Sequence, residues 1–147
     1  MKILVPVDGS KYSMEALNVA LDCAKAKDAA VDVISVVPDT SGIDLEISAS
    51  QRERVSQRME QQADSVVKKA CEVISRAGVK ADCQVVSSAS SIADAILEIS
   101  EEKKTDLIIM GSRGLSPSSR FKMGSVASQV VRYSDCSVYV VKLPLAQ

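Results

Sequence analysis

Residues 106–126 read DLIIMGSRGLSPSSRFKMGSV, an apolar run followed by a glycine-rich loop and the start of a helical pattern. Three of the six glycines in the chain fall inside this stretch, at Gly111, Gly114 and Gly124. Glycine permits positive φ and lets backbone N–H groups approach an anion without a Cβ in the way, and the N–H groups at a helix N-terminus favour phosphate. The stretch therefore predicts a strand, a phosphate-binding loop and a helix that opens at Gly124 and Ser125.

The glycines of this loop follow the spacing G-x2-G-x9-G-S. The spacing differs from G-x-x-x-x-G-K-[ST] and from G-x-G-x-x-G, so it supports neither a Walker-type NTPase nor a dinucleotide dehydrogenase. Arg113, Arg120 and Lys122 supply positive charge beside the loop, and such side chains either touch a bound anion or are solvated. By itself the pattern also fits a glycine-rich turn before a helix, and the residues leave that alternative open.

Outside this stretch, short apolar runs alternate with helical patterns. Consecutive apolar and β-branched residues, typical of strands covered on both faces, occur at 2–7, 31–37, 80–86, 106–110 and 137–141. Apolar residues at steps of three and four predict helices near 14–24, 50–77, 92–99 and 124–133. We expect one α/β domain over residues 1–147, with a doubly wound, Rossmann-like, five-stranded parallel sheet and about four helices.

The predicted helices carry recognisable end signals. Either Ser10 or Ser13 can cap the first helix, and Ser91 opens the third in a capping box with Asp in place of Glu. Gly78 stands where the C-terminal cap of the second helix belongs. The irregular stretch 38–49 is either a lid over a site or a mobile connection.

The composition is that of an ordinary globular protein. Of its 147 residues, 46% are hydrophobic and 25% charged, and 18 Lys plus Arg nearly balance 19 Asp plus Glu. We therefore expect no attraction to nucleic acid or to an anionic membrane. The apolar run at 3–7 is too short for a signal peptide or a membrane span, so we expect a soluble cytoplasmic protein.

The four cysteines lie far apart in the sequence and lack the spacing of metal ligands. They are interpreted as reduced thiols packed as small hydrophobes: Cys23, Cys71, Cys83 and Cys136.

These motifs resemble the universal stress proteins, whose nucleotide-binding branch carries G-x2-G-x9-G-[ST] after the fourth strand. The spacing here is the same, and the resemblance extends over essentially the whole chain, through 3–10, 106–116, 124–126, 135–136 and 138–141. The chain departs from the family just before the third helix. The family often has a Gly and a Pro there, whereas residues 87–91 of this chain are a run of Ser and Ala. It also departs at Ser137, where the family usually has Pro, and at Pro117 and Lys122 within the loop.

The resemblance implies a homodimer that binds ATP, with or without Mg²⁺ or Mn²⁺, and acts as a nucleotide-dependent switch in stress responses with slow or no hydrolysis. It implies that Asp8 reaches the ribose and the metal, with Pro6 and Val7 beside it, and that the backbone of Val36 meets the adenine edge. The loop residues that would line the ribose and phosphates are Met110, Gly111, Ser112, Arg113, Gly114, Leu115 and Ser116. The residues that would hold the phosphates are Gly124, Ser125 and Val126. The alternative for Asp8 is a carboxylate that only shapes a turn and a helix start.

Two other functions are weighed against this one. The chain has no histidine, and Asp8 is the only carboxylate that we place near the phosphates, so no catalytic residue is assigned. An adenylating enzyme of the adenine-nucleotide α-hydrolase kind carries S-G-G-x-D-S after its first strand, whereas residues 8–13 read DGSKYS. A nucleotide-free dimeric interaction module, the family's other branch, tends to lack the glycine pattern. In either branch the apolar edge strand 137–141 is expected to pair with a second subunit.

Overall fold

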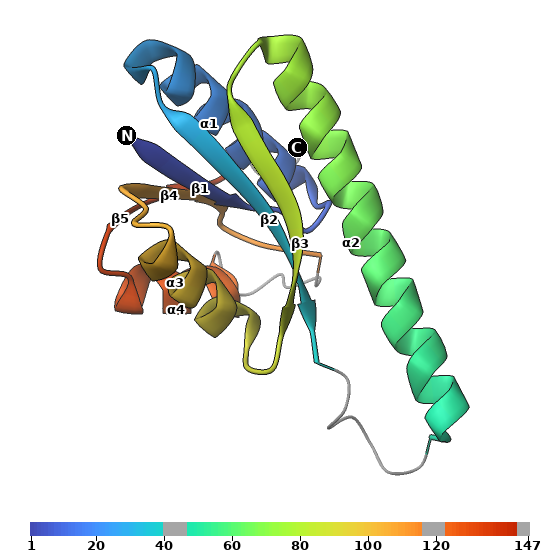
Figure 1. The fold of residues 1–147 in the computed structure, drawn as a ribbon. Helices are drawn as coiled ribbons and strands as arrows, with labels where there is room; N and C mark the ends of the chain where they lie inside the picture. The colour runs from blue at the N-terminus through green and yellow to red at the C-terminus, as the bar shows by residue number, and fades with distance from the viewer. Residues whose placement is uncertain (40–46, 116–122, 144–147) are drawn as a thin grey trace.

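The computed structural model describes residues 1–39, 47–115 and 123–143, in which five strands alternate with four helices (Figure 1). In chain order the elements are β1 Lys2–Pro6, α1 Lys11–Lys27, β2 Ala30–Pro38, α2 Ala49–Ala77, β3 Ala81–Ser88, α3 Ile92–Glu102, β4 Leu107–Gly111, α4 Ser125–Tyr133 and β5 Ser137–Val141. All neighbouring strands are parallel, in the order β3-β2-β1-β4-β5. The predicted doubly wound α/β fold is confirmed.

The core lies on both faces of the sheet. On one face, residues of α1 and α2 pack against alternate positions of β1 and β2, such as Ile3 and Val33. On the other face, α3 and α4 pack against the intervening positions, such as Leu4 and Ile34. Because both faces are covered, consecutive residues of the central strands are buried, which is why these strands read as continuous apolar runs.

Local signals set most of the helix ends. Of the two candidate caps for α1, Ser10 is the cap, since its Oγ accepts a hydrogen bond from Ser13 N at 3.2 Å. Ser91 Oγ accepts from Asp94 N at 3.1 Å at the start of α3, which confirms the cap, but the Asp94 carboxylate does not return the second bond of the expected capping box. Gly78 ends α2 in the left-handed conformation, with φ 70°. Helix α2 also begins with a capping box at Ser48 and Gln51 that the sequence analysis did not identify.

Strand ends differ from the expected ranges by one or two residues, because pairing rather than apolarity decides them. Strand β3 continues to Ser88, beyond the expected end at residue 86, since β2 continues to Pro38 and the two strands pair to their last residues. Strand β1 ends at Pro6, where its pairing with Ile34 of β2 is the last. Val7 stays buried but lies beyond that ladder.

The strand order places a switch point between β1 and β4. From β1 the chain crosses to β2 through α1, and from β4 it crosses in the other direction to β5 through α4. In open α/β sheets a crevice forms outside the carboxyl ends of the strands at such a point.

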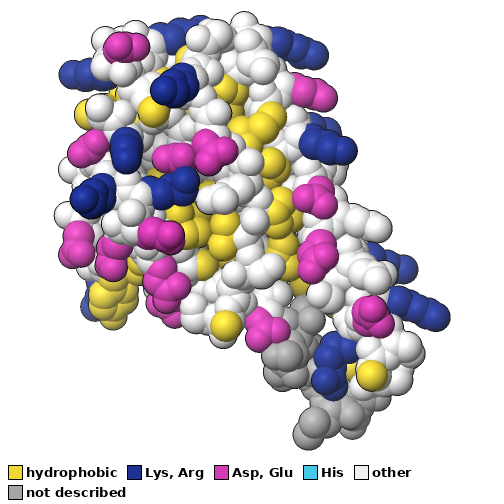
Figure 2. Space-filling view, in the orientation of Figure 1, with side chains coloured by type: hydrophobic (Ala, Val, Ile, Leu, Met, Phe, Trp, Pro, Cys, Tyr) yellow, Lys and Arg dark blue, Asp and Glu magenta, His cyan; other side chains and the backbone are white. Residues whose placement is uncertain are grey.

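Figure 2 shows positive and negative side chains intermixed over one face of the molecule, as the near balance of charges leads one to expect. Among the described residues, none of the helices combines the length and apolarity that a membrane span needs.

Candidate functional site

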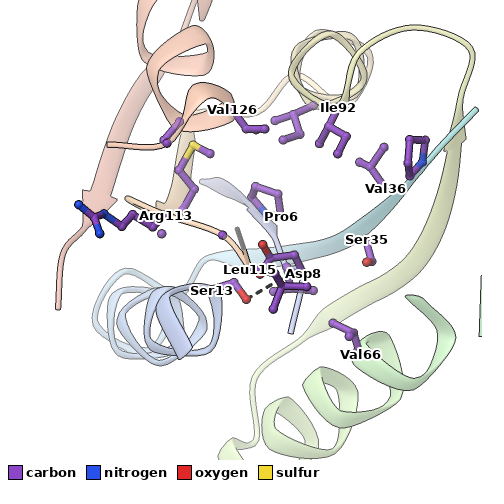
Figure 3. Close-up of a pocket in the computed structure, with 18 of the residues that line it drawn as sticks. Pro6, Asp8, Ser13, Ser35, Val36, Val66, Ile92, Arg113, Leu115 and Val126 are labelled. Atoms are coloured by element: carbon purple, nitrogen blue, oxygen red, sulfur yellow. Dashed lines mark hydrogen bonds between the residues drawn. The ribbon is translucent and has the colours of Figure 1, made fainter. Parts of the chain in front are cut away.

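A cavity of about 550 Å³ opens at the carboxyl edge of the sheet (Figure 3). Its floor is formed where β1, β2 and β4 end, one wall by α2, and the opposite wall by α3 and α4. Thirteen of the fourteen predicted site residues line it, namely Pro6, Val7, Asp8, Val36, Met110, Gly111, Ser112, Arg113, Gly114, Leu115, Gly124, Ser125 and Val126. The remaining one, Ser116, lies outside the described residues, as do Arg120 and Lys122.

The helical walls of this cavity were not predicted from the sequence. Helix α2 contributes Met59, Gln62, Ala63 and Val66, and α3 contributes Ile92 and Ile96. These residues carry the ordinary period of a core-facing helix, and nothing in a linear motif distinguishes a helix face that covers a cavity from one that covers the sheet. The only available signal was the length of α2, whose 29 residues are far more than the adjoining strands can cover.

Asp8 is held at the mouth of the cavity by the turn that leads into α1. Its Oδ1 accepts a hydrogen bond from Ser10 N at 2.9 Å, and its own N–H donates to Ser13 Oγ at 3.3 Å (Figure 3). This is an Asx-type turn, in which the carboxylate takes the place of a backbone acceptor. The side chain is nevertheless exposed, and its second oxygen remains directed toward the glycine loop at Gly114.

Two glycines of the loop, Gly111 and Gly114, serve close approach rather than unusual φ, which corrects part of the expectation. Among the described glycines only Gly9 and Gly78 have positive φ, so Gly111, Gly114 and Gly124 do not need glycine for their backbone conformation. A Cβ on Gly114 would lie 2.6 Å from Asp8 Oδ2. A Cβ on Gly111 would lie 2.7 Å from Tyr12 Cβ, in the first turn of α1. The absence of two methyl groups therefore lets β4 and the loop lie against the β1–α1 turn.

The N-terminus of α4 faces the cavity without a side-chain cap. Serine hydroxyls cap α1, α2 and α3, whereas α4 begins after Gly124 with no side-chain hydrogen bond. The N–H of Gly124 itself donates to Ser112 O at 2.7 Å, so this group is not available to an anion as expected. The first bond within the helix runs from Ser128 N to Gly124 O, which leaves the N–H groups of residues 125–127 without an acceptor inside the helix. All three residues line the cavity.

Strand β2 presents backbone groups to the cavity at Val36. The carbonyl of Ile34 accepts from Val7 N at 2.8 Å, so the backbone of Ile34 points toward β1. Alternate residues of a strand point to the same side, and Val36 therefore directs its N–H and C=O to that side as well. The pairing of β1 with β2 ends at Ile34, so none of the described strands pairs with Val36 on this side. A donor and an acceptor are thus placed side by side above the cavity floor.

The lining is mainly apolar, and its described part carries only two charged residues, Asp8 and Arg113. Figure 3 shows the guanidinium of Arg113 directed away from Asp8, so only its backbone lies along the loop in the way that the resemblance implies. Among the residues described here, no three His, Cys, Asp or Glu side chains converge in a way that would hold a metal ion.

The model of the universal stress protein family matches residues 1–142. The chain belongs to this family. It is 36% identical over 143 residues, or 97% of its length, to universal stress protein MJ0531 of Methanocaldococcus jannaschii, of which it covers 82%.

Two solved structures share the fold over nearly their full length. Protein MJ0577 is 25% identical, with a TM-score of 0.86 and coverage of 99% of this chain and 97% of that one. A universal stress protein solved in complex with cAMP is also 25% identical, with a TM-score of 0.73 and coverage of 98% of both chains. The family is thus shown over the whole described fold, the cavity included.

Proposed function

We propose that this universal stress protein binds an adenine nucleotide, with ATP as the ligand, and acts as a nucleotide-dependent regulatory switch. The observation that carries the proposal is the pairing of two features across one cavity. The N-terminus of α4, which has no side-chain cap, offers backbone N–H groups at one side. The backbone edge of Val36, with which none of the described strands pairs on the β1 side, offers a donor and an acceptor at the other. The cAMP complex of a relative supports the same ligand class.

The base would lie at the Val36 side of the cavity. Adenine presents an acceptor at N1 beside a donor at its 6-amino group, which complements one N–H and one C=O of the same residue. The surrounding surface is apolar, with Ile92 and Ile96 from α3 and Met110 from β4. A flat aromatic base buries its faces against such a surface while its edge is read by the backbone.

The phosphates would lie at the α4 side. The helix dipole and the N–H groups of residues 125–127 stabilise negative charge there, and the Ser125 hydroxyl adds a further donor. The ribose falls between the two ends, where Asp8 can accept hydrogen bonds from its hydroxyls. A divalent ion would be bound by the phosphate oxygens together with Asp8, the one carboxylate that lines the described part of the cavity.

Hydrolysis of the nucleotide is expected to be slow or absent, because the chain has no histidine and the described lining has no second carboxylate.

Titration calorimetry with ATP, ADP, AMP, cAMP and ITP, each with and without Mg²⁺, tests this proposal. Inosine has an acceptor at position 6 and an N–H donor at position 1, the opposite of adenine. Its edge does not match the N–H and C=O of Val36, so we expect ITP to bind more weakly than ATP by about tenfold or more. Equal affinity for ATP and ITP would contradict the role of Val36. The absence of heat and of thermal protection by every nucleotide would remove the proposed function altogether.

A homodimer formed through β5 is part of the proposal. Strand β5 is an edge of the sheet, and Tyr139 in its middle is 52% exposed. Bare apolar edges promote pairing between chains. Light scattering should give a dimer for the native protein and a monomer for Tyr139→Lys, while Val55→Lys on α2, at a position 38% exposed, should leave the dimer intact. A native monomer at micromolar concentration would contradict this part.

A further inference from the structure

Cys71 and Cys83 lie on neighbouring elements away from the glycine loop. Cys71 belongs to α2, and Cys83 belongs to β3, the edge strand along which α2 runs (Figure 1). Both are free thiols, and both are half-buried. The nucleotide site described above uses neither residue.

The helix period directs Cys71 toward the sheet. Cys71 follows Val67 by four residues and precedes Ile74 by three, and both of those residues are buried on the sheet-facing side of α2. Residues at these spacings share one face of a helix. Cys71 is therefore on the flank of the buried face rather than on the solvent side of α2.

The strand register directs Cys83 toward the same helix layer. Cys83 pairs with Val33 of β2, and Val33 is completely buried in the core cluster that α1 and α2 cover. Cys83 packs against that cluster. The two cysteines thus face each other across the α2–β3 interface.

Both cysteines also lie at the same height above the turn that joins their elements. Six residues of helix separate Cys71 from the end of α2 at Ala77, which is about 9 Å at 1.5 Å per residue. The chain then turns at Gly78 and is already paired with β2 at Lys80, whose carbonyl accepts from Val31 N. The three steps from Lys80 to Cys83 advance about 10 Å along the strand. The two distances match, so the two cysteines lie at corresponding heights along α2 and β3.

The environment of Cys83 agrees with this geometry. Burial, followed by a hydrogen bond with the Cys71 side chain, raises the pKa of the Cys83 thiol well above its ordinary value. The contribution of Cys71 to this shift agrees with two side chains that lie near each other across the α2–β3 interface. The raised pKa keeps the Cys83 thiol protonated near neutral pH.

We propose that Cys71 and Cys83 form a site of reversible oxidation, closing an intrachain disulfide that ties α2 to β3. A low-molecular-weight disulfide such as oxidised glutathione is the oxidant. Cys71 loses its proton and attacks one glutathione sulfur, whose S–S bond breaks and releases one glutathione thiolate. Cys83 then loses its proton and attacks the Cys71 sulfur of the mixed disulfide, and the second glutathione leaves. The two protons go to the two glutathione thiolates, so two protein thiols are oxidised and one glutathione disulfide is reduced.

Such a bond would hold the helix that forms a wall of the cavity. Val66 lies on α2 five residues before Cys71, and its Cγ2 would be 2.9 Å from a Cβ on Gly9, directly after Asp8. Fixing α2 on β3 therefore fixes the element that packs on the Asp8 turn. This consequence for the cavity rests on the proposed function, whereas formation of the disulfide does not.

Peptide mapping of the folded protein after equilibration in mixtures of oxidised and reduced glutathione tests the proposal. Samples are quenched in acid, free thiols are blocked with N-ethylmaleimide, and the tryptic peptides are identified by mass spectrometry. We expect a peptide pair joined through Cys71 and Cys83 that dithiothreitol separates. The double variant C23S/C136S should form the same link, and C83S should stop at a glutathione adduct on Cys71.

Free or glutathionylated Cys71 and Cys83 throughout the native titration would overturn the proposal, as would bonds that join either residue to Cys23, to Cys136 or to another chain. Because the native protein is itself mapped, the result does not depend on whether any variant folds. Because no readout involves a nucleotide, failure here is distinct from failure of the proposed function.

Discussion

Replacing Gly111 by alanine puts a methyl group at the closest contact between β4 and α1. The new Cβ would lie 2.7 Å from Tyr12 Cβ and 2.8 Å from the Tyr12 carbonyl carbon. Carbon atoms in favourable contact are about 3.5–4.0 Å apart, so the end of β4 and the first turn of α1 must separate. Overpacking of this kind costs about 1–3 kcal/mol, and the lower entropy of the unfolded chain returns about 0.4–1 kcal/mol. We expect a net loss of about 1–2 kcal/mol.

Gly124→Ala is the matched control, since it changes the same residue type in the same motif. There the new Cβ would lie 3.6 Å from Ser112 O and 3.7 Å from Arg113 Cα, which are ordinary contacts. The φ of −72° suits alanine. Alanine is a poorer N-cap than glycine by about 0.5 kcal/mol, and the entropy gain offsets a similar amount. We expect the free energy of unfolding to change by less than about 0.5 kcal/mol.

Urea unfolding followed by circular dichroism measures both variants. The Gly111→Ala midpoint should fall at unchanged m-value, with a thermal midpoint lower by about 3 °C for each kcal/mol lost. The Gly124→Ala curve should overlay that of the native protein. Equal losses in the two variants, or a native curve for Gly111→Ala, would refute the reasoning that the motif's first glycine is required for packing.

Three further outcomes are expected. Asp8→Asn keeps an acceptor for Ser10 N and should melt like the native protein, but the loss of charge at the ribose should weaken ATP by about tenfold in titration calorimetry. Ser10→Ala removes the cap that accepts from Ser13 N and should lower the unfolding free energy by about 1 kcal/mol in urea. Cys83 should resist iodoacetamide at pH 8. Burial keeps the pKa of its thiol above that of the unfolded chain, so the reactive thiolate forms only at higher pH. Mass spectrometry should show rapid labelling of Cys83 once urea unfolds the protein.

Much of the fold was predictable from local patterns. The β-branched runs predicted all five strands to within two residues, since strands covered on both faces leave no room for polar alternation. Ser91 and Gly78 predicted helix ends correctly, and Ser10 was one of two candidate caps for α1, because a cap acts on the backbone three or four residues away. The resemblance carried by the glycine spacing implied a set of loop residues, and all of them except Ser116, which lies outside the described residues, line the cavity.

What the chain determined by itself is therefore the kind and sequence of its elements and the residues that end them. Only the tertiary structure decided what meets at the cavity, because strand order and helix packing depend on contacts between residues far apart in the chain. The order β3-β2-β1-β4-β5 brings Gly114 to Asp8, and among the described strands it leaves Val36 of β2 beyond the last pair with β1. The packing of α2 turns Val66 from a core position into a cavity wall, and it places Cys71 opposite Cys83. A helical period specifies which face is buried, but not what that face covers.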